Sequence, residues 1–546
     1  MTWLTRSIYQ AVLGITFLAT TGPSLASDSL QPNFLVILAD DLGFSDFGCY
    51  GGEIRTPNID ALAAGGLRYS QFYNTARCWP TRAALLTGYY PQQMGRDALP
   101  VKAGQKKPRP FNQARPQWAR LLPDLLQPLG YRCYHSGKWH VDGKPLNHGF
   151  HHSYELRTPR GYFASDLHTL DGEKHPDASE DFYVTTAVAD HAIEFLQQHE
   201  KQSPDQPFFE YIAFTAPHFP LHAPQADINK YVGRYDRGWD EVRQRRWQKL
   251  NQLHPFAGEL SALEPNIGTP YPWTFEKAAD ILGPGEVNAE VAWDSLNDVQ
   301  KKFQAMKMAI HAAMIDRMDR EIGRIVAQLR DSGKLDNTVI MILSDNGASA
   351  EIMVRGDGHD PTAPLGSAAT YLCLGAGWSS AANTPFRRHK TWVHEGGIAT
   401  PMVVHWPDGI STRGEWRTAA GHVIDIAPTM VELAGGFWPI KSKGINVPPT
   451  PGRSIASTFR KDTLLNRKAI WWLHEDNRAI RMGNWKLVAA KQEPWELYDL
   501  SQDRAETNNL ATKHPRRTKQ LAQKWQAMTE EFMQLRDNGY VYQTAK

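Results

Sequence analysis

The chain has 546 residues, and its 60 Lys and Arg nearly balance its 58 Asp and Glu. This balance excludes a generally basic nucleic-acid-binding protein, and the sequence has no acidic run typical of a solvating tail. Hydrophobic residues make up 41% and charged residues 22%, as in globular proteins. The length exceeds that of one ordinary core and predicts a large domain with a smaller one.

The first 26 residues have the features of a secretory signal peptide. A single Arg precedes an apolar stretch at residues 8–20, and Ser24-Leu25-Ala26 is a small-x-small cleavage pattern. The apolar stretch is shorter than the roughly 20 residues that a membrane-spanning helix needs, although a membrane anchor is the alternative. No comparable run follows residue 26. We predict an exported protein, periplasmic or secreted, without a membrane span in its mature form.

Helices and buried strands alternate along the next 400 residues. The strands are predicted from continuous apolar runs, which are typical of strands covered on both faces, and the helices from apolar residues at helical spacing. In chain order, the predicted elements are a strand at 33–39, helices at 117–129 and 185–198, a strand at 207–214, a helix at 304–329, strands at 338–343 and 401–406, and a helix at 424–433. This order predicts an α/β fold with a large, mostly parallel central sheet flanked by helices.

Two regions depart from this alternation. Residues 225–298 are rich in Trp, Tyr, Arg and Pro with weak periodicity, which indicates either an elaborated surface region near the site opening or a solvated excursion. From about residue 455, short segments broken by turn residues predict a small antiparallel sheet, followed by a charged helix at 515–536. We therefore predict a main domain over residues 27–454 and a C-terminal subdomain over residues 455–546.

Carboxyl and amide side chains follow two of the predicted buried strands. Asp40 and Asp41 come after the strand at 33–39, and Asp345 and Asn346 come after the strand at 338–343. Ligands of open parallel sheets bind beyond the carboxyl ends of the strands. Oxygen ligands without His or thiolate favour a hard cation such as Ca²⁺ or Mg²⁺ over zinc. A single pair is more often a solvated loop or a helix cap, but two pairs ending matching strands indicate a metal site.

Residues 78–88 read CWPTRAALLTG. The segment resembles the signature of the type I sulfatases in the alkaline phosphatase superfamily, which is Cys-x-Pro-x-Arg followed after three residues by Leu-Thr-Gly. Every defining position matches. The alternative for Cys78 is an ordinary buried or disulfide-bonded residue. Cys49, Cys78, Cys133 and Cys373 allow three complete pairings, none of which is possible if Cys78 is catalytic.

The resemblance extends over nearly the whole mature chain. Its other segments are weak individually, but their order and spacing are specific. They are GGEIRTPNID at 51–60, GKWH at 137–140, PHFP at 217–220, SDNG at 344–347, NTPFRRHK at 383–390 and HEGG at 394–397. The family implies an alkaline-phosphatase-like fold, with a small C-terminal antiparallel sheet and helix beside the large sheet.

The resemblance also implies the modified nucleophile and its metal. A maturation enzyme oxidises the signature cysteine, here Cys78, to formylglycine, whose hydrated aldehyde attacks sulfur. Residue 78 then joins Asp40, Asp41, Asp345 and Asn346 around Ca²⁺, with Mg²⁺ as the alternative.

The remaining catalytic residues lie on the matched motifs, and the charge of the substrate explains why such residue types are needed. Lys138 and Lys390 are suited to hold the oxygens of a sulfate ester, because fixed cations stabilise its charge. His218 is our candidate for the acid that protonates the leaving alcohol. The resemblance implies that Arg82 steadies the hydrate and that His140 helps to remove a proton from it.

We therefore predict a sulfatase that acts on a sulfated small molecule or glycan. One alternative is a phosphate or phosphonate ester hydrolase of the same superfamily, which Cys78 and the lack of His in the metal pairs disfavour. A second is an inactive glycan-binding relative, which is expected to have lost a ligand or a cation. Substrate choice is expected to reside in the loops at 100–116, 225–298 and 348–380, whose sequences do not identify the substrate.

Overall fold

The computed structural model describes residues 31–97, 115–156, 161–177, 179–256, 258–355 and 358–537. The predicted signal peptide and most of the loop at 100–116 lie outside these residues. The described residues form one compact unit by their contacts, and the boundary predicted at residue 455 stays a prediction. No helix within the described ranges is long and apolar enough to cross a membrane.

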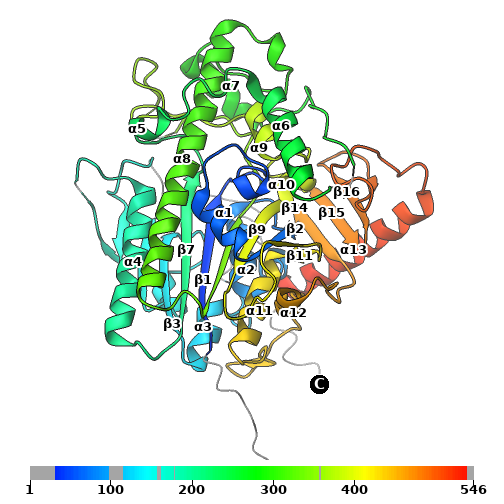
Figure 1. The fold of residues 1–546 in the computed structure, drawn as a ribbon. Coiled ribbons are helices and arrows are strands. Elements are labelled where there is room, and N and C mark those ends of the chain that lie inside the picture. Colours follow the sequence, from blue (N-terminus) through cyan, green and yellow to red (C-terminus); the bar gives the residue numbers. More distant parts are fainter. Residues whose placement is uncertain are drawn as a thin grey trace, which may run out of the picture. The chain divides into compact units, whose positions relative to one another are not determined.

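A large sheet of eleven strands organises the fold (Figure 1). Its strand order is β10-β2-β9-β8-β1-β7-β3-β4-β5-β6, with β11 also paired to β2. The five central strands β8, β1, β7, β3 and β4 are parallel, whereas β9 runs antiparallel to both β8 and β2. The bounds are β1 (Asn33–Asp40), β2 (Leu67–Tyr73), β3 (Arg132–Lys138), β4 (His152–Leu156), β5 (His168–Leu170), β6 (Glu173–Lys174), β7 (Phe208–Pro217), β8 (Thr338–Ser344), β9 (Ala399–His405), β10 (Glu415–Arg417) and β11 (Gly421–His422).

Helices cover both faces of the sheet, which explains the continuous apolar strands. Alternate residues of β1 enter two different cores: Leu35 and Ile37 pack in one, and Val36 and Leu38 in the other. The first core includes α1 (Pro57–Ala64), α4 (Val184–Gln202) and α8 (Asp298–Asp331), the last two lying side by side (Figure 1). The second includes α2 (Cys78–Thr87), α3 (Leu122–Leu126) and α11 (Ile426–Leu433). The predicted fold class is therefore confirmed.

The predicted helices differ from the structure in two regions. The helix expected at 117–129 begins only at Leu122 in α3, because Pro123 in its first turn favours a helix start and cannot donate a backbone hydrogen bond within a helix. Residues 225–298, whose periodicity was weak, contain α5 (Gln225–Ile228), α6 (Gly238–Leu253) and α7 (Pro272–Leu282). Four short elements follow later in the chain: α9 (Ala376–Ala382), β12 (Lys441–Ser442), β13 (Ile445–Asn446) and α12 (Ala456–Arg460).

The C-terminal part forms the predicted antiparallel sheet and helix. Its four strands are β14 (Ile470–His474), β15 (Asn477–Met482), β16 (Trp485–Ala489) and β17 (Glu496–Asp499), and α13 (Pro515–Asp537) packs on β15 and β16. Leu487, Leu497 and Leu521 belong to the small core between them.

A buried ion network links this sheet to the region of the large one. The ammonium of Lys486 on β16 lies 2.9 Å from Glu395, in α10 (Glu395–Ile398), and 2.7 Å from Glu506. Arg504 lies 2.9 Å from Glu395. We call these four residues the C-terminal charge cluster. All four are buried.

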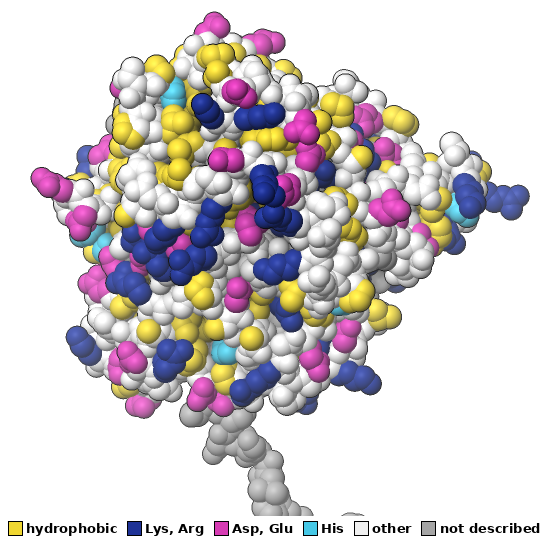
Figure 2. Space-filling view, turned by 45° about the horizontal axis from the view of Figure 1, so that its top comes forward, with side chains coloured by type: hydrophobic (Ala, Val, Ile, Leu, Met, Phe, Trp, Pro, Cys, Tyr) yellow, Lys and Arg dark blue, Asp and Glu magenta, His cyan; other side chains and the backbone are white. Residues whose placement is uncertain are grey.

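Charges on the surface are mixed, as the near-zero net charge leads us to expect. Figure 2 shows one face, on which many Lys and Arg side chains gather across the middle, with Asp, Glu and hydrophobic groups between and around them. The positive charge relevant to an anionic substrate must therefore be local.

Candidate active site

The register of the two central strands brings the acidic pairs together. Ala39 of β1 lies opposite Ser344 of β8, so the residues that follow these strands meet at the carboxyl edge of the sheet. Asn346 Nδ2 donates to Asp41 Oδ1 at 2.7 Å, and the backbone N–H of Asp41 donates to Asp345 Oδ1 at 3.4 Å. Asp40, Asp41, Asp345 and Asn346 are all buried.

These side chains present unsatisfied oxygens. Ligand atoms of Asp40, Cys78 and Asp345 lie within 4.8 Å of one another, as do those of Asp40, Asp41 and His218. Oδ1 of Asp40 and Oδ1 of Asn346 are buried without a hydrogen-bond partner among the described residues. Burial and the neighbouring charge of Asp40 raise the pKa of Asp345 to about 7. A hard divalent cation binds oxygens that lack a hydrogen-bond partner and neutralises carboxylates that lie close together, so this group fits a metal site.

The candidate nucleophile begins a helix. Cys78 is the first residue of α2, and Gly88 ends that helix with a left-handed backbone (φ 75°), as the signature glycine permits. Burial raises the pKa of the Cys78 thiol, which opposes thiolate chemistry at neutral pH. One turn later, Arg82 donates to Asp345 Oδ2 at 2.7 and 3.0 Å and to the carbonyl oxygen of Lys138 at 2.8 Å.

Two lysines reach the same place from different segments. Lys138 ends β3 and pairs with Asp40, whereas Lys390 pairs with Asp41 and Glu351, each at 2.8 Å. Burial opposes the charge of Lys390, but the two carboxylates raise its pKa overall. Burial likewise opposes the charge of Lys138, but Asp40 and its other neighbours raise its pKa overall. Both ammonium groups therefore stay charged at neutral pH.

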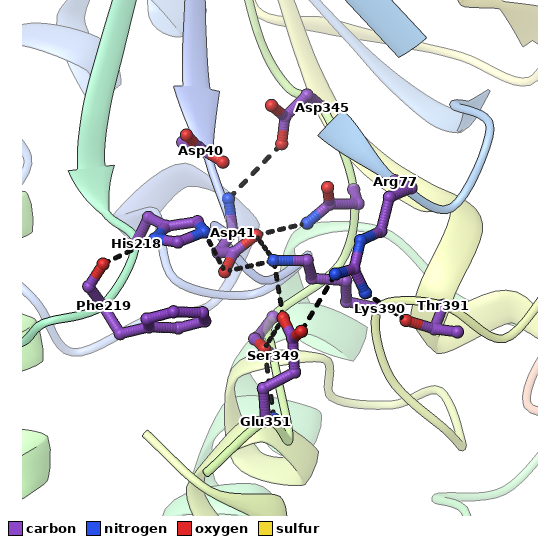
Figure 3. Close-up of polar contacts among 12 residues, drawn as sticks. Asp40, Asp41, Arg77, His218, Phe219, Asp345, Ser349, Glu351, Lys390 and Thr391 are labelled. Atoms are coloured by element: carbon purple, nitrogen blue, oxygen red, sulfur yellow. Dashed lines mark hydrogen bonds and ion pairs between the residues drawn. The ribbon is translucent and has the colours of Figure 1, made fainter. Parts of the chain in front are cut away.

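The two candidate histidines have different surroundings. His218 Nε2 lies 3.7 Å from Asp41 Oδ2, and its Nδ1 lies 2.6 Å from the carbonyl oxygen of Phe219 (Figure 3). Burial lowers the pKa of His218 to about 4, despite Asp41 and Asp40. His140 is partly exposed on the pocket wall. Desolvation by its neighbours and the charges of Lys138 and Arg82 lower its pKa, and its Nδ1 has no hydrogen-bond partner in the described part of the chain.

A pocket of about 400 Å³ collects most of the predicted catalytic residues. Its wall includes Cys78, Lys138, His140, His218 and Lys390. Arg82 is fully buried and lies behind the wall, where it holds Asp345. Cys49, Cys78, Cys133 and Cys373 are all free, so no disulfide competes for residue 78.

Comparison with known proteins identifies the family. The family profile described as Sulfatase matches residues 32–436, which is most of the chain. The chain belongs to the sulfatase family. A second profile, described as N-sulphoglucosamine sulphohydrolase, C-terminal, matches residues 387–537 of this sulfatase. The predicted family and the predicted enzyme class, a sulfuric ester hydrolase, are therefore confirmed.

Individual relatives agree with this assignment along most of their length. The sulfatase is 34% identical to an uncharacterized sulfatase of Schizosaccharomyces pombe, over 91% of this chain and 93% of the relative. It is 29% identical to an arylsulfatase of Klebsiella aerogenes, over 78% of this chain and 91% of the relative. The structure of BT4656 in complex with its substrate D-glucosamine-2-N,6-O-disulfate superposes with a TM-score of 0.61 at 20% identity, covering 93% of this chain and 99% of that one.

Three charged residues at the sulfatase pocket were not singled out from the sequence. Arg77 and Arg355 line the pocket, and Glu351 pairs with Arg77 at 2.9 Å and with Lys390. Arg77 directly precedes Cys78, and this position next to the candidate nucleophile could have identified it as a pocket residue. Glu351 and Arg355 lie in the loop after β8, in a segment (ASAEIMVR, 348–355) that matches none of the motifs of the resemblance.

Proposed function

We propose that this sulfatase hydrolyses a sulfate ester of a carbohydrate, with a formylglycine formed at residue 78 and a divalent cation. The observation that carries the proposal is the position of Cys78. Its sulfur lies beside Asp40 and Asp345 and also on the wall of a pocket that contains Lys138 and Lys390. A nucleophile at this point meets both a metal and the cations that a sulfate group requires.

Asp40, Asp41, Asp345, Asn346 and the side chain at residue 78 would hold the cation. Ca²⁺ is our first choice, because it accepts a flexible set of oxygen ligands, and Mg²⁺ is the alternative. When bound, the cation supplies Lewis acidity toward a sulfate oxygen and orients the ester.

The protein side chains bind the sulfate and move protons. Lys138 and Lys390 hold sulfate oxygens, and Arg82 steadies residue 78 through Asp345. One oxygen of the hydrated side chain attacks sulfur as an alkoxide, and the bond from sulfur to the alcohol oxygen breaks. His140 then accepts the proton of the second hydroxyl, so that the bond from the side-chain carbon to the sulfate oxygen breaks and the aldehyde reforms. His218 protonates the leaving alcohol. Because burial lowers its pKa to about 4, His218 needs a nearby negative charge to hold a proton at neutral pH, and the ester oxygens supply one.

Two further properties belong to this proposal. The pocket volume accommodates a sulfate group on a sugar ring, and a structural relative binds a sulfated glucosamine. Arg355 is exposed on the pocket wall without a carboxylate partner among the described residues, which favours an anionic sugar. The sequence of residues 1–26 supports export to the periplasm or secretion, with a formylglycine-generating enzyme as a partner during maturation.

Mass spectrometry of the peptide that ends at Arg82 tests the proposal. In protein made with a maturation system, conversion of thiol to aldehyde lowers the mass of this peptide. We expect Cys78→Ser to abolish turnover in a host that cannot oxidise serine, with an unchanged melting temperature. The matched control is Cys373→Ser, at another buried free cysteine, which should retain turnover. An unmodified thiol in fully active enzyme, or faster turnover of phosphate than of sulfate esters, contradicts the proposal.

A further inference from the structure

A buried carboxylate outside the predicted site joins two cations of the pocket. Glu351 is 1% exposed, its Oε1 lies 2.9 Å from Arg77 Nη2, and its Oε2 lies 2.8 Å from Lys390 Nζ (Figure 3). Ser349 Oγ donates to the same Oε2 at 3.1 Å and accepts from the Glu351 backbone N–H at 3.2 Å. Both cations line the pocket, whereas Glu351 does not.

The ammonium of Lys390 lies between the carboxylates of Asp41 and Glu351, which have different roles. Asp41 belongs to the group that fits a metal, and a cation held there would draw on the carboxylate that contacts Lys390. Glu351 is in neither group of convergent ligand atoms. It is therefore the carboxylate that stays committed to Lys390, and a buried charge without a partner is strongly destabilised.

Arg77 connects Glu351 to the nucleophile along the chain. It directly precedes Cys78 and has an extended backbone at the start of α2. Its guanidinium lies 5.0 Å from the ring centre of Trp79 and 5.3 Å from that of Tyr271, and it donates to Thr391 Oγ1 at 2.7 Å. Because Thr391 follows Lys390, Glu351 and Arg77 fasten the start of α2 to the segment that carries the lysine.

The backbone near these contacts is strained. The non-glycine residues Asp41, Ala76 and Thr391 have left-handed φ values of 64°, 66° and 88°. Such conformations are unfavourable and persist only where surrounding contacts hold them. The ion pairs of Glu351 are contacts of this kind.

We propose that Glu351 is a positioning residue of the sulfatase reaction, which fixes Lys390 and Arg77 relative to residue 78. The inference rests on the proposed roles of Cys78 and Lys390. Glu351 touches no reacting atom and acts through the two cations. The competing explanation is that Glu351 only neutralises buried charge and so affects stability alone.

A double-mutant cycle distinguishes these explanations. We expect Glu351→Gln, which keeps the shape and removes the charge, to lower kcat/KM for 4-nitrophenyl sulfate by about 10–100-fold, the range found for residues that orient catalytic ligands. Inhibition by free sulfate should weaken in parallel. In the Lys390→Ala and Arg77→Ala backgrounds, the same substitution should have a much smaller effect, because residues that act through one another are not additive.

Three controls keep the test decisive. Rates are normalised to the formylglycine content of each variant. Glu286→Gln breaks another buried pair, Glu286–Lys307 at 2.6 Å, and should lower the melting temperature without changing kcat/KM of the folded enzyme. If Glu351→Gln does not fold, the cycle is measured with Glu351→Asp, which keeps the charge and shortens the side chain.

Two results overturn the inference: a kcat/KM within twofold of wild type, or losses that are fully additive in both backgrounds. Failure of the proposed function is a separate outcome. It appears in the wild-type enzyme as an active, unmodified Cys78, and the rates of the cycle are then normalised to folded protein.

Discussion

The carboxyl edge of the large sheet and the C-terminal charge cluster both bury carboxylates beside Lys and Arg, and they differ in what occupies the centre. In the C-terminal charge cluster, the ammonium of Lys486 lies between Glu395 and Glu506. At the sheet edge, three aspartates converge, and oxygens of Asp40 and Asn346 lack hydrogen-bond partners among the described residues. The cation of the first cluster lies at its centre, whereas the second keeps bare oxygens that fit a metal ion, although Lys138, Lys390 and Arg82 pair with its aspartates. Substitutions should therefore affect stability in the first and catalysis in the second.

The largest effect is expected at the sheet edge, from Asp345→Asn. Loss of a Lewis acid that supplies several kcal/mol should lower kcat by at least about 10³-fold. Chelation should have the same effect on wild type, and Ca²⁺ or Mg²⁺ should reverse it. Thermal unfolding should show that Ca²⁺ stabilises wild type but not the variant, because a ligand that binds only the folded state raises its stability. Full turnover of metal-free enzyme would show that these oxygens do not hold a catalytic metal.

His218→Ala sharpens the comparison within the pocket. If His218 protonates the leaving alcohol, its loss should lower the rate on a sulfated sugar by about 10²-fold, at the low end of general acid catalysis, and change 4-nitrophenyl sulfate little. Lys390→Ala should reduce both rates similarly, because the sulfate charge is common to the two substrates. Equal losses for His218→Ala on both substrates would assign it to positioning, and His140 would be the next candidate for the acid.

Lys486→Met should give the opposite result to Asp345→Asn. Removal of the ammonium leaves Glu395 and Glu506 buried without it, which should cost about 3–5 kcal/mol of folding free energy. The turnover of the fraction that remains folded should be unchanged. Denaturant unfolding and activity normalised to folded protein measure the two quantities. A stable Lys486→Met enzyme with impaired turnover would remove the distinction between the clusters.

The elements that the sequence predicts well are those with a local signal. Carboxylates directly follow the apolar runs of β1 and β8. Because the carboxyl ends of parallel strands lie at the same edge of a sheet, the sequence predicted that Asp40 and Asp345 lie close together. The segment around Cys78 matched the sulfatase signature, so the sequence alone predicted the family. The site also depends on features with no local signal. Glu351 is a loop acid until the segment with Lys390 folds against it, and the low pKa of His218 arises from burial by distant residues. The antiparallel direction of β9 is likewise set by its sheet neighbours.

The order of the strands also determines when, during synthesis, the central strand can pair with its neighbours. β1 pairs with β7 and β8, which begin at Phe208 and Thr338, so the central strand has no native partner until much of the chain exists. At about 5–20 residues per second, synthesis alone delays its first partner by on the order of 10 s. Cys78, which folding buries almost completely, is still reachable during that interval. Under the proposed function, the late completion of the sheet would give the formylglycine-generating enzyme time to act on residue 78 before the native contacts enclose it.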